Sequence, residues 1–305
     1  MTSPERADAV SAFGRMLTAM VTPFDADGAL DLVAAVRVAA HLVDAGCDGL
    51  VLSGTTGESP TTSDDEKRLL VEAVVDAVGD RARIVAGVGT NDTVHSVELA
   101  ESAASAGADG LLVVTPYYSK PPPEGLLAHF GSVADATDLP VMLYDIPGRT
   151  GTRIGSQVLT ALAEHPRILA VKDATGDLTA GSWVMRETDL AYYSGDDALN
   201  LAWLAHGAVG MVSVVSHAAA GPYADMVAAA VKGDLTTARE VHERLLPAVR
   251  GVMTRTQGVI AVKAALQLAG VLAHRTVRAP LPAATDDEVA QLRADLVAAG
   301  LLPTD

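Results

Sequence analysis

The sequence contains a single cysteine, Cys47, among its 305 residues. One cysteine cannot form a disulfide within the chain, so no disulfide framework contributes to the fold. Cys47 stands in the stretch Ala-Gly-Cys-Asp-Gly at residues 45–49, directly before an apolar run. We therefore predict that it is a small core residue and not a nucleophile.

Aromatic residues and clusters of basic residues are also scarce. Aromatic side chains make up 4% of the chain against 49% hydrophobic residues, so the core has to be aliphatic, as in repeated α/β packing. The formal net charge is -16 and no basic stretch stands out, which excludes a surface for nucleic acid. An anionic substrate would need a locally placed cation, for which Arg149 is a candidate.

Linkers and long apolar runs are missing as well. No stretch rich in proline, glycine or serine divides the chain, which favours one large domain with an extension. No apolar run approaches the length of a membrane span, and residues 1–15 lack the apolar segment of a signal peptide. We therefore expect a cytoplasmic protein.

A short pattern recurs along the chain: the end of a helix, a glycine, and then a buried strand. It appears at residues 44–52 and 105–113, and more loosely at residues 206–213. Eight apolar runs fit strands, and alanine-rich segments of helical length separate them. The predicted strands cover residues 17–22, 48–53, 83–88, 109–114, 140–144, 168–172, 190–194 and 209–214. Continuous apolar strands joined through helices predict a parallel sheet, and eight such units predict a closed (β/α)8 barrel, the TIM barrel.

The strand pattern stops near residue 216. Four further segments have helical composition and periodicity, and they cover residues 217–231, 235–248, 256–270 and 286–298. We therefore expect a catalytic barrel over residues 1–216 and a C-terminal helical extension over residues 217–305 that closes the barrel and contributes to assembly. Ser63 with Glu66, and Thr285 with Glu288, have the spacing of capping boxes.

A doubly wound nucleotide-binding fold is the structural rival. The stretch Gly-Val-Gly-Thr-Asn-Asp at residues 87–92 lacks the third glycine of the dinucleotide fingerprint, and no phosphate-binding Gly-Lys-Ser/Thr loop occurs. Both observations argue against NAD and ATP.

Lys172 ends the apolar run at residues 168–171 and precedes Asp-Ala-Thr-Gly. An ammonium group at the mouth of a buried strand loses hydration, its pKa falls, and the neutral amine can attack a ketone carbonyl. The residues alone leave open the plainer interpretation, in which Lys172 ends a strand and points into water.

Polar residues follow several predicted strands at their carboxyl ends, where barrel enzymes hold their substrates. Gly54–Gly57 offers two threonine hydroxyls and closely spaced amides that suit a carboxylate, although a strand-to-helix turn needs no function. Tyr144 ends the strand beside Lys172 and could move protons, although a strand tyrosine can also simply pack.

Four motifs in this order resemble 4-hydroxy-tetrahydrodipicolinate synthase, also called dihydrodipicolinate synthase, from about Met16 through the C-terminal helices. They are Gly-Thr-Thr-Gly-Glu-Ser at 54–59, Pro-Tyr-Tyr at 116–118, Tyr-Asp-Ile-Pro-Gly-Arg-Thr at 144–150 and Lys-Asp-Ala-Thr-Gly at 172–176. The family belongs with the class I pyruvate aldolases and N-acetylneuraminate lyase.

The resemblance implies a role for each matching residue. Lys172 forms an imine with pyruvate, Tyr144 moves the proton, and Thr55 links Tyr144 to Tyr118 in a relay. Arg149 receives the carboxylate of L-aspartate 4-semialdehyde. The resemblance further implies that substrate is bound by Thr56, Gly195 and Val212.

The resemblance also implies partners and cofactors. The residue matching Tyr118 enters the site of a neighbouring subunit, so we expect a homo-oligomer, usually a dimer of dimers. No metal or organic cofactor is expected, because lysine itself serves as the electron sink and the eight histidines are scattered.

Two other functions stay open. N-acetylneuraminate lyase and 2-keto-3-deoxy sugar acid aldolases share the lysine motif, but they generally lack an arginine at the position of Arg149. A non-catalytic binding protein on the same fold is the third possibility, since a fold alone does not fix an activity.

Relatives that are inhibited by lysine use histidines in the helix after the Gly-Thr-Thr-Gly-Glu motif and a glutamate on the helix after the third strand. Asp64 and Lys67 stand at the histidine positions here, and His95 stands where the glutamate is expected. Asn91 and Tyr117 are kept. We therefore expect only weak inhibition by lysine.

Overall fold

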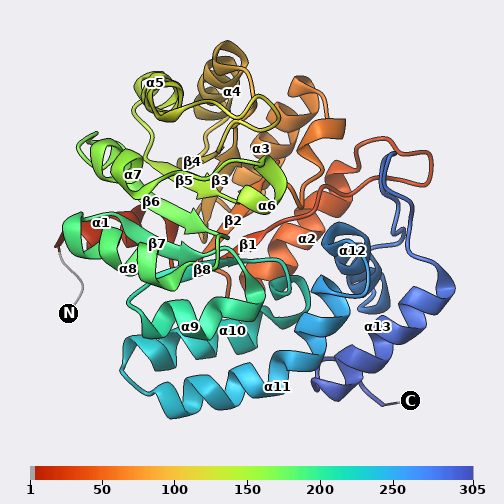
Figure 1. Ribbon diagram of the computed structural model, residues 1–305. Coiled ribbons are helices and arrows are strands. Elements are labelled where there is room, and N and C mark those ends of the chain that lie inside the picture. The colour runs from red at the N-terminus through yellow and green to blue at the C-terminus, as the bar shows by residue number, and fades with distance from the viewer. Residues whose placement is uncertain (1–3, 305) are drawn as a thin grey trace.

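The computed structural model describes residues 4–304 and shows eight parallel strands in a closed barrel, ordered β1 to β8 with β8 paired to β1. Figure 1 shows the strands at the centre and helices around them. The strands are β1 (Met16–Ala19), β2 (Gly49–Leu52), β3 (Arg83–Gly87), β4 (Gly110–Val114), β5 (Val141–Asp145), β6 (Ile168–Asp173), β7 (Ala191–Ser194) and β8 (Gly210–Ser213). The predicted barrel is confirmed, although β1 ends three residues earlier than the sequence indicated.

Helices between the strands form the outer layer. They are α2 (Leu32–Asp44), α3 (Asp64–Val78), α4 (Thr93–Ser105), α5 (Pro123–Asp135), α6 (Pro147–Thr150), α7 (Ser156–Leu162), α8 (Leu178–Glu187) and α9 (Asn200–Ala205), with 3-10 turns η1 (Ser59–Thr61) and η2 (Asp197–Leu199). The three recurring glycines Gly46, Gly107 and Gly207 all have positive φ, at 108°, 89° and 102°. Each follows a helix and turns the chain toward the next strand in a conformation that glycine adopts without strain.

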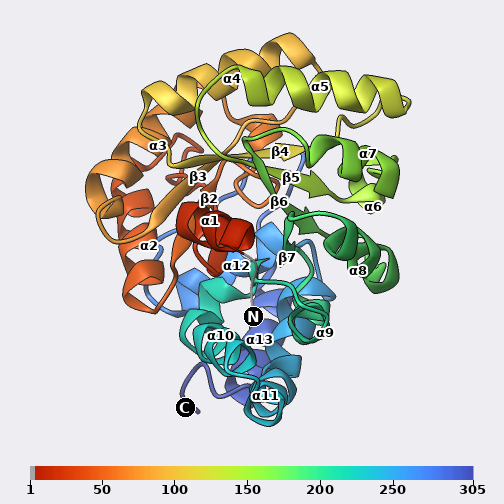
Figure 2. The same ribbon diagram turned by 90° about the vertical axis from the view of Figure 1, so that its left-hand side faces the viewer.

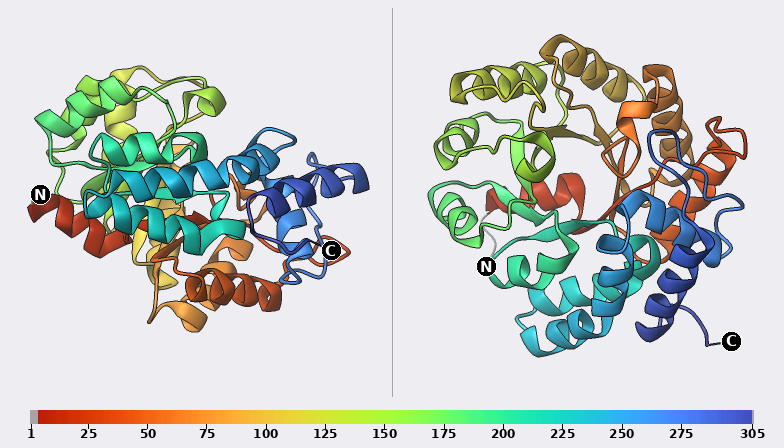
Figure 3. Two further views of the ribbon diagram at one scale, coloured as in Figure 1. Left: turned by 90° about the horizontal axis from the view of Figure 1, so that it is seen from below. Right: turned by 45° about the vertical axis from the view of Figure 1, so that its right-hand side comes forward.

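The predicted C-terminal helices are present as α10 (Ser216–Val231), α11 (Leu235–Met253), α12 (Gly258–Leu268) and α13 (Asp286–Ala298). Figure 3 shows α10 and α11 side by side and α13 at the far end of the molecule. Both predicted capping boxes form, at Ser63 with Glu66 and at Thr285 with Glu288. The predicted domain limits 1 and 305 lie outside the described residues, as does the start of the segment that we searched for a signal peptide.

The sequence reading did not identify the first helix, α1 (Pro4–Phe13). Figure 2 shows it across the end of the barrel that faces the viewer. Ala9 and Phe13 belong to the same apolar cluster as the inward-facing residues Leu17, Val51 and Met142. The helix thus covers the amino-terminal end of the barrel, and the carboxyl ends of the strands remain available for a site.

The core is mainly aliphatic, as expected, with aromatic side chains such as Phe130 and Trp203 buried in it, and Cys47 is a buried free thiol within it. Burial raises the pKa of Cys47 to about 12, which makes its thiolate inaccessible near neutral pH. Among residues 4–304, none of the helices combines the length and the apolar character that a bilayer span requires.

Candidate functional site

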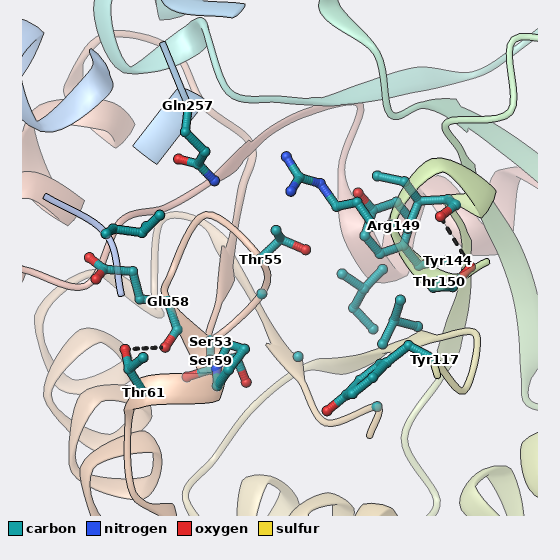
Figure 4. Close-up of a pocket in the computed structure, with 18 of the residues that line it drawn as sticks. Ser53, Thr55, Glu58, Ser59, Thr61, Tyr117, Tyr144, Arg149, Thr150 and Gln257 are labelled. Carbon is teal, nitrogen blue, oxygen red and sulfur yellow. Dashed lines mark hydrogen bonds between the residues drawn. The ribbon is translucent and has the colours of Figure 1, made fainter. Parts of the chain in front are cut away.

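A cavity of about 340 Å³ lies at the carboxyl ends of the strands. Its walls come from the loop after β2, from β3 to β5, from α6 and from the segment around α12. Thr55, Tyr144 and Arg149 all line it, so the structure brings together three of the residues that the sequence indicated. Figure 4 shows these three side chains around one space, with Gln257 facing them from the C-terminal extension.

Lys172 lies beside this cavity, one residue before the end of β6. Parallel pairing places its Cα opposite that of Tyr144 on β5, and its Nζ lies 4.1 Å from the centre of the Tyr144 ring. The side chain is buried, and it makes no hydrogen bond or ion pair with any residue in the described range. The amine is therefore held against the phenol and has no fixed partner to keep it protonated.

Burial lowers the pKa of Lys172 to about 8, Asp197 raises it, and Arg149 lowers it. Desolvation is the largest of these causes, because a charged ammonium loses more hydration energy than a neutral amine. At pH 8 about half of the Lys172 side chains would be neutral amines.

Tyr144 is held by its backbone as well as by packing. The carbonyl oxygen of Tyr144 accepts hydrogen bonds of 3.0 Å from both the amide and the hydroxyl of Thr115. Burial raises the pKa of the phenol to about 12, while Arg149 and the Thr55 hydroxyl act in the opposite direction. The phenol is thus a neutral proton donor at physiological pH.

Arg149 stands on the one-turn helix α6, at the exposed rim of the cavity. Among the residues in the described range it has no ion-pair partner. The guanidinium is thus a free fork of donors at the cavity mouth, which suits a carboxylate.

The remaining predicted site residues do not line the cavity. Thr56 is buried in the turn after β2, and Val212 is buried inside the barrel on β8. Gly195 lies against the Lys172 side chain, since a Cβ at Gly195 would come within 3.0 Å of the Lys172 Cγ. Gly195 therefore leaves room for the lysine, a contact that strand pairing alone would not reveal.

Tyr118 projects from the chain instead of entering the cavity. Its side chain is 90% exposed, and its backbone φ is 69°, in the left-handed region that non-glycine residues rarely occupy. Tyr117, its neighbour, lines the cavity instead.

One wall of the cavity comes from the C-terminal extension and was not predicted from the sequence. It is formed by Gln257, Arg278, Pro280 and Leu281. Gln257 caps α12: its side-chain oxygen accepts a 2.6 Å hydrogen bond from the amide of Val259. This fixes the oxygen outside the cavity and leaves the amide nitrogen directed toward Thr55 and Arg149 (Figure 4). A glutamine directly before a helix is a weak sequence signal for a functional residue. Gln257 is far from Thr55 in the sequence, and only the fold brings both side chains to the same cavity.

No group of three or more histidine, cysteine, aspartate or glutamate side chains in residues 4–304 is arranged to hold a metal ion. The cavity is lined by a phenol, hydroxyls and a guanidinium, and the amine of Lys172 lies beside it.

Comparisons with known proteins find relatives that match almost the whole chain. The model of the dihydrodipicolinate synthetase family matches residues 12–299. The 4-hydroxy-tetrahydrodipicolinate synthase of Kineococcus radiotolerans is 64% identical over 303 residues, which cover 99% of this chain and 98% of the relative. The 4-hydroxy-tetrahydrodipicolinate synthase 2 of Streptomyces coelicolor is 61% identical over 289 residues, covering 95% and 96%.

Solved structures of lower sequence identity have the same fold. The DHDPS from Cyanidioschyzon merolae, crystallised with lysine bound, superposes with a TM-score of 0.91 at 41% identity and covers 95% of this chain and 99% of its own. The chloride-inhibited dihydrodipicolinate synthase from Acinetobacter baumannii, in complex with pyruvate, gives 0.90 at 33% identity, covering 94% and 99%.

Proposed function

The chain belongs to the dihydrodipicolinate synthetase family, and from this premise we propose that it joins pyruvate to L-aspartate 4-semialdehyde through an imine on Lys172. The activity is that of the curated relatives: a lyase reaction that gives 4-hydroxy-tetrahydrodipicolinate in diaminopimelate and lysine biosynthesis. The observation that carries the assignment of Lys172 is its buried, unpaired amine, 4.1 Å from the Tyr144 ring centre and beside a cavity with a free guanidinium at its mouth.

Imine formation begins with the neutral amine of Lys172. Its lone pair attacks the ketone carbon of pyruvate, and the carbinolamine that results loses water to give a protonated imine. Tyr144 lies against the amine and supplies a neutral phenol, so we assign to it the proton transfers to and from the departing oxygen.

The carboxylate of pyruvate has to sit where donors are available without a competing negative charge. The turn after β2 supplies the hydroxyls of Thr55 and Thr56, and its closely spaced amides add further donors. We place the pyruvate carboxylate at this turn, with Gly195 giving room beside Lys172 and Val212 closing the barrel side.

The second half of the reaction uses the imine as an electron sink. The methyl carbon of the bound pyruvate loses a proton, and the resulting enamine attacks the aldehyde carbon of the semialdehyde. The amino group of the semialdehyde then attacks the imine carbon, closes the ring and releases Lys172, so that one water is lost overall. Arg149 binds the semialdehyde carboxylate at the cavity mouth, and no metal or organic cofactor is needed.

The family resemblance further suggests that the protein works in the cytoplasm and as a homo-oligomer, with a tetramer as the expected form. Tyr118 supports this assembly, because its phenol is exposed and does not line the cavity that contains Thr55 and Tyr144. In the proposed relay, Thr55 connects Tyr144 to a Tyr118 supplied by a second subunit.

Two measurements test the proposal. Purified protein should consume pyruvate and L-aspartate 4-semialdehyde together, and pyruvate with borohydride should add mass to the peptide that contains Lys172. A label on Lys263, or condensation of pyruvate with a sugar aldehyde in place of the semialdehyde, would overturn the assignment.

A further inference from the structure

A second buried lysine, Lys263 on α12, forms an ion pair with Glu58 at the end of the turn after β2. Its Nζ lies 2.5 Å from Glu58 Oε1 and donates a second hydrogen bond of 2.8 Å to the carbonyl of Thr276. The ammonium also lies 4.2 Å from the centre of the Phe24 ring. Both partners of the pair are almost completely buried, with side-chain exposures of 0% and 2%.

The second oxygen of Glu58 is also held by the C-terminal extension. Glu58 Oε2 accepts a 2.9 Å hydrogen bond from the backbone amide of Arg278. The Arg278 guanidinium donates to the carbonyl of Thr61 and pairs with Glu66, and so ties the same extension to the start of α3. Figure 3 shows the segment after α12 running alongside the early part of the chain. Both oxygens of one carboxylate therefore connect the extension to a turn about 200 residues earlier.

This turn has an unusual backbone. Ser53 and Glu58 stand at its two ends, and both are non-glycine residues in the left-handed region, with φ of 53° and 54°. Between them lie the threonines that we assign to the pyruvate carboxylate. Such conformations cost free energy and persist only where surrounding contacts determine them. The contacts of Glu58 with Lys263 and Arg278 are contacts of that kind.

Stability alone does not account for a buried ion pair at this point. Replacing such a pair by apolar residues of similar size is often neutral or favourable, because desolvation offsets much of the attraction. A fixed charge pair does specify one geometry, since a carboxylate with both oxygens bound cannot rotate.

We propose that Glu58 and Lys263 are positioning residues, through which the C-terminal extension fixes the turn at residues 53–58 in the shape that binds the substrate carboxylate. This inference rests on the proposed function, in which Thr55 and Thr56 bind that carboxylate. Glu58 lines the cavity and Lys263 does not, but both oxygens of Glu58 are already bound by the extension, so we assign neither residue to the substrate. Their effect is expected on pyruvate affinity and on imine formation.

The test compares Lys263→Met with a control in the same extension. Asp295 on α13 is a second buried carboxylate, paired with Arg250 and Arg255, and it contacts no part of the turn. Asp295→Asn should lower the unfolding midpoint and leave the KM for pyruvate unchanged. Lys263→Met should raise the KM for pyruvate by about 10- to 100-fold, because a misplacement of about 1 Å in a binding group can cost that much.

A double variant keeps the test decisive if Lys263→Met folds poorly. Glu58→Gln with Lys263→Met removes both charges and leaves no unpaired carboxylate in the core. It should still raise the KM for pyruvate, when assayed below its own unfolding midpoint. An unchanged KM in both folded variants would overturn the inference. Pyruvate trapping on Lys172 in the unaltered protein separates this outcome from a failure of the proposed function, since trapping depends on Lys172 and not on Lys263.

Discussion

The two buried lysines, Lys172 and Lys263, have similar surroundings but different partners. The Nζ of Lys172 lies 4.1 Å from the centre of the Tyr144 ring, and the Nζ of Lys263 lies 4.2 Å from the centre of the Phe24 ring. Burial lowers the pKa of each to about 8. The difference is the carboxylate: Lys263 is bound to Glu58, whereas Lys172 has no hydrogen-bonded acceptor within the described residues.

In the proposed mechanism, this difference separates a structural lysine from a nucleophile. Glu58 raises the pKa of Lys263 against the effect of burial, and deprotonation of the ammonium would remove the ion pair with Glu58. Asp197 also raises the pKa of Lys172, but its two oxygens already accept hydrogen bonds from Ser213, Asn200 and two backbone amides. In the proposed mechanism, desolvation of the lysine is therefore not sufficient, and the amine also has to be free of a bound acceptor.

The largest effect is expected from Lys172→Met. Removing the nucleophile should lower kcat by about 10⁴- to 10⁶-fold, the range seen when a covalent catalyst is deleted. Steady-state assays with both substrates measure the loss. Borohydride should then trap no pyruvate, and any label that moved to Lys263 would break the comparison.

The free energy of unfolding should change in the opposite order, with the larger loss in Lys263→Met and not in Lys172→Met. Lys263→Met leaves Glu58 buried without its cation, which typically costs about 3–5 kcal/mol. Lys172→Met removes an unpaired buried cation and should leave the free energy of unfolding unchanged or raise it. Urea unfolding of the two methionine variants provides the comparison, and equal losses in both would contradict it.

Each lysine also has an arginine that lowers its pKa, Arg149 for Lys172 and Arg278 for Lys263. Of these two arginines, only Arg149 is free to bind a ligand. Arg149→Ala should therefore lower kcat/KM for the semialdehyde, with a loss of about 2–4 kcal/mol of transition-state stabilisation. Pyruvate trapping should survive in this variant. Unchanged condensation kinetics would show that the semialdehyde carboxylate is bound elsewhere.

The pH dependence of pyruvate trapping should follow Lys172. Its pKa of about 8 lies below the usual value, so the neutral amine is lost as pH falls and the trapping rate should drop about tenfold per unit below 8. The folded-state depression also means that Lys172 opposes folding below pH 8 and that this cost lessens as pH rises toward the unfolded value. Arg149→Ala should shift the profile to higher pH, and an identical profile would exclude Arg149 as a cause.

The smallest effect is expected from added lysine. A third lysine, Lys67, is half-buried near the surface, donates to the Thr62 carbonyl and lies 3.6 Å from Asp64. Asp64 also accepts a 2.9 Å hydrogen bond from His95, so its carboxylate already has two partners. Millimolar lysine should therefore inhibit weakly, as a dose-response assay will measure. Strong inhibition would mean that the ligand ammonium displaces His95.

Much of the barrel could be predicted because its strands are short, continuous apolar runs with glycine before them. The position of Lys172 at the end of a buried strand could be predicted from the same pattern, because the lysine ends such a run, and the pairing of β5 with β6 brings Tyr144 beside it. The helix α1 could not, because its ten residues have no clear apolar face to mark a helix in sequence.

The pairing of Glu58 with Lys263 was beyond sequence reasoning for a different reason. Lys263 lies in the apolar helix α12, and the residues on both sides of it are buried. From sequence alone, a single lysine in such a helix is expected to extend its charged end to the surface. Its acceptor, Glu58, is 205 residues away in the sequence, and the sequence around neither residue predicts a contact with the other. Contacts of this kind depend on how the C-terminal extension packs against the barrel, and the hydrophobic periodicity of the sequence does not predict that packing.

In the proposed assembly, the exposed phenol of Tyr118 makes the rate of catalysis depend on the protein concentration. In the proposed relay, a chain on its own holds an amine and a cavity but presents Tyr118 to water. Assembly then obeys mass action, so each tenfold dilution through the dissociation constant of the subunits would lower the share of completed sites. The rate per molecule would fall with dilution even though every chain stays folded, and the cell's supply of active sites would scale more steeply than its supply of chains.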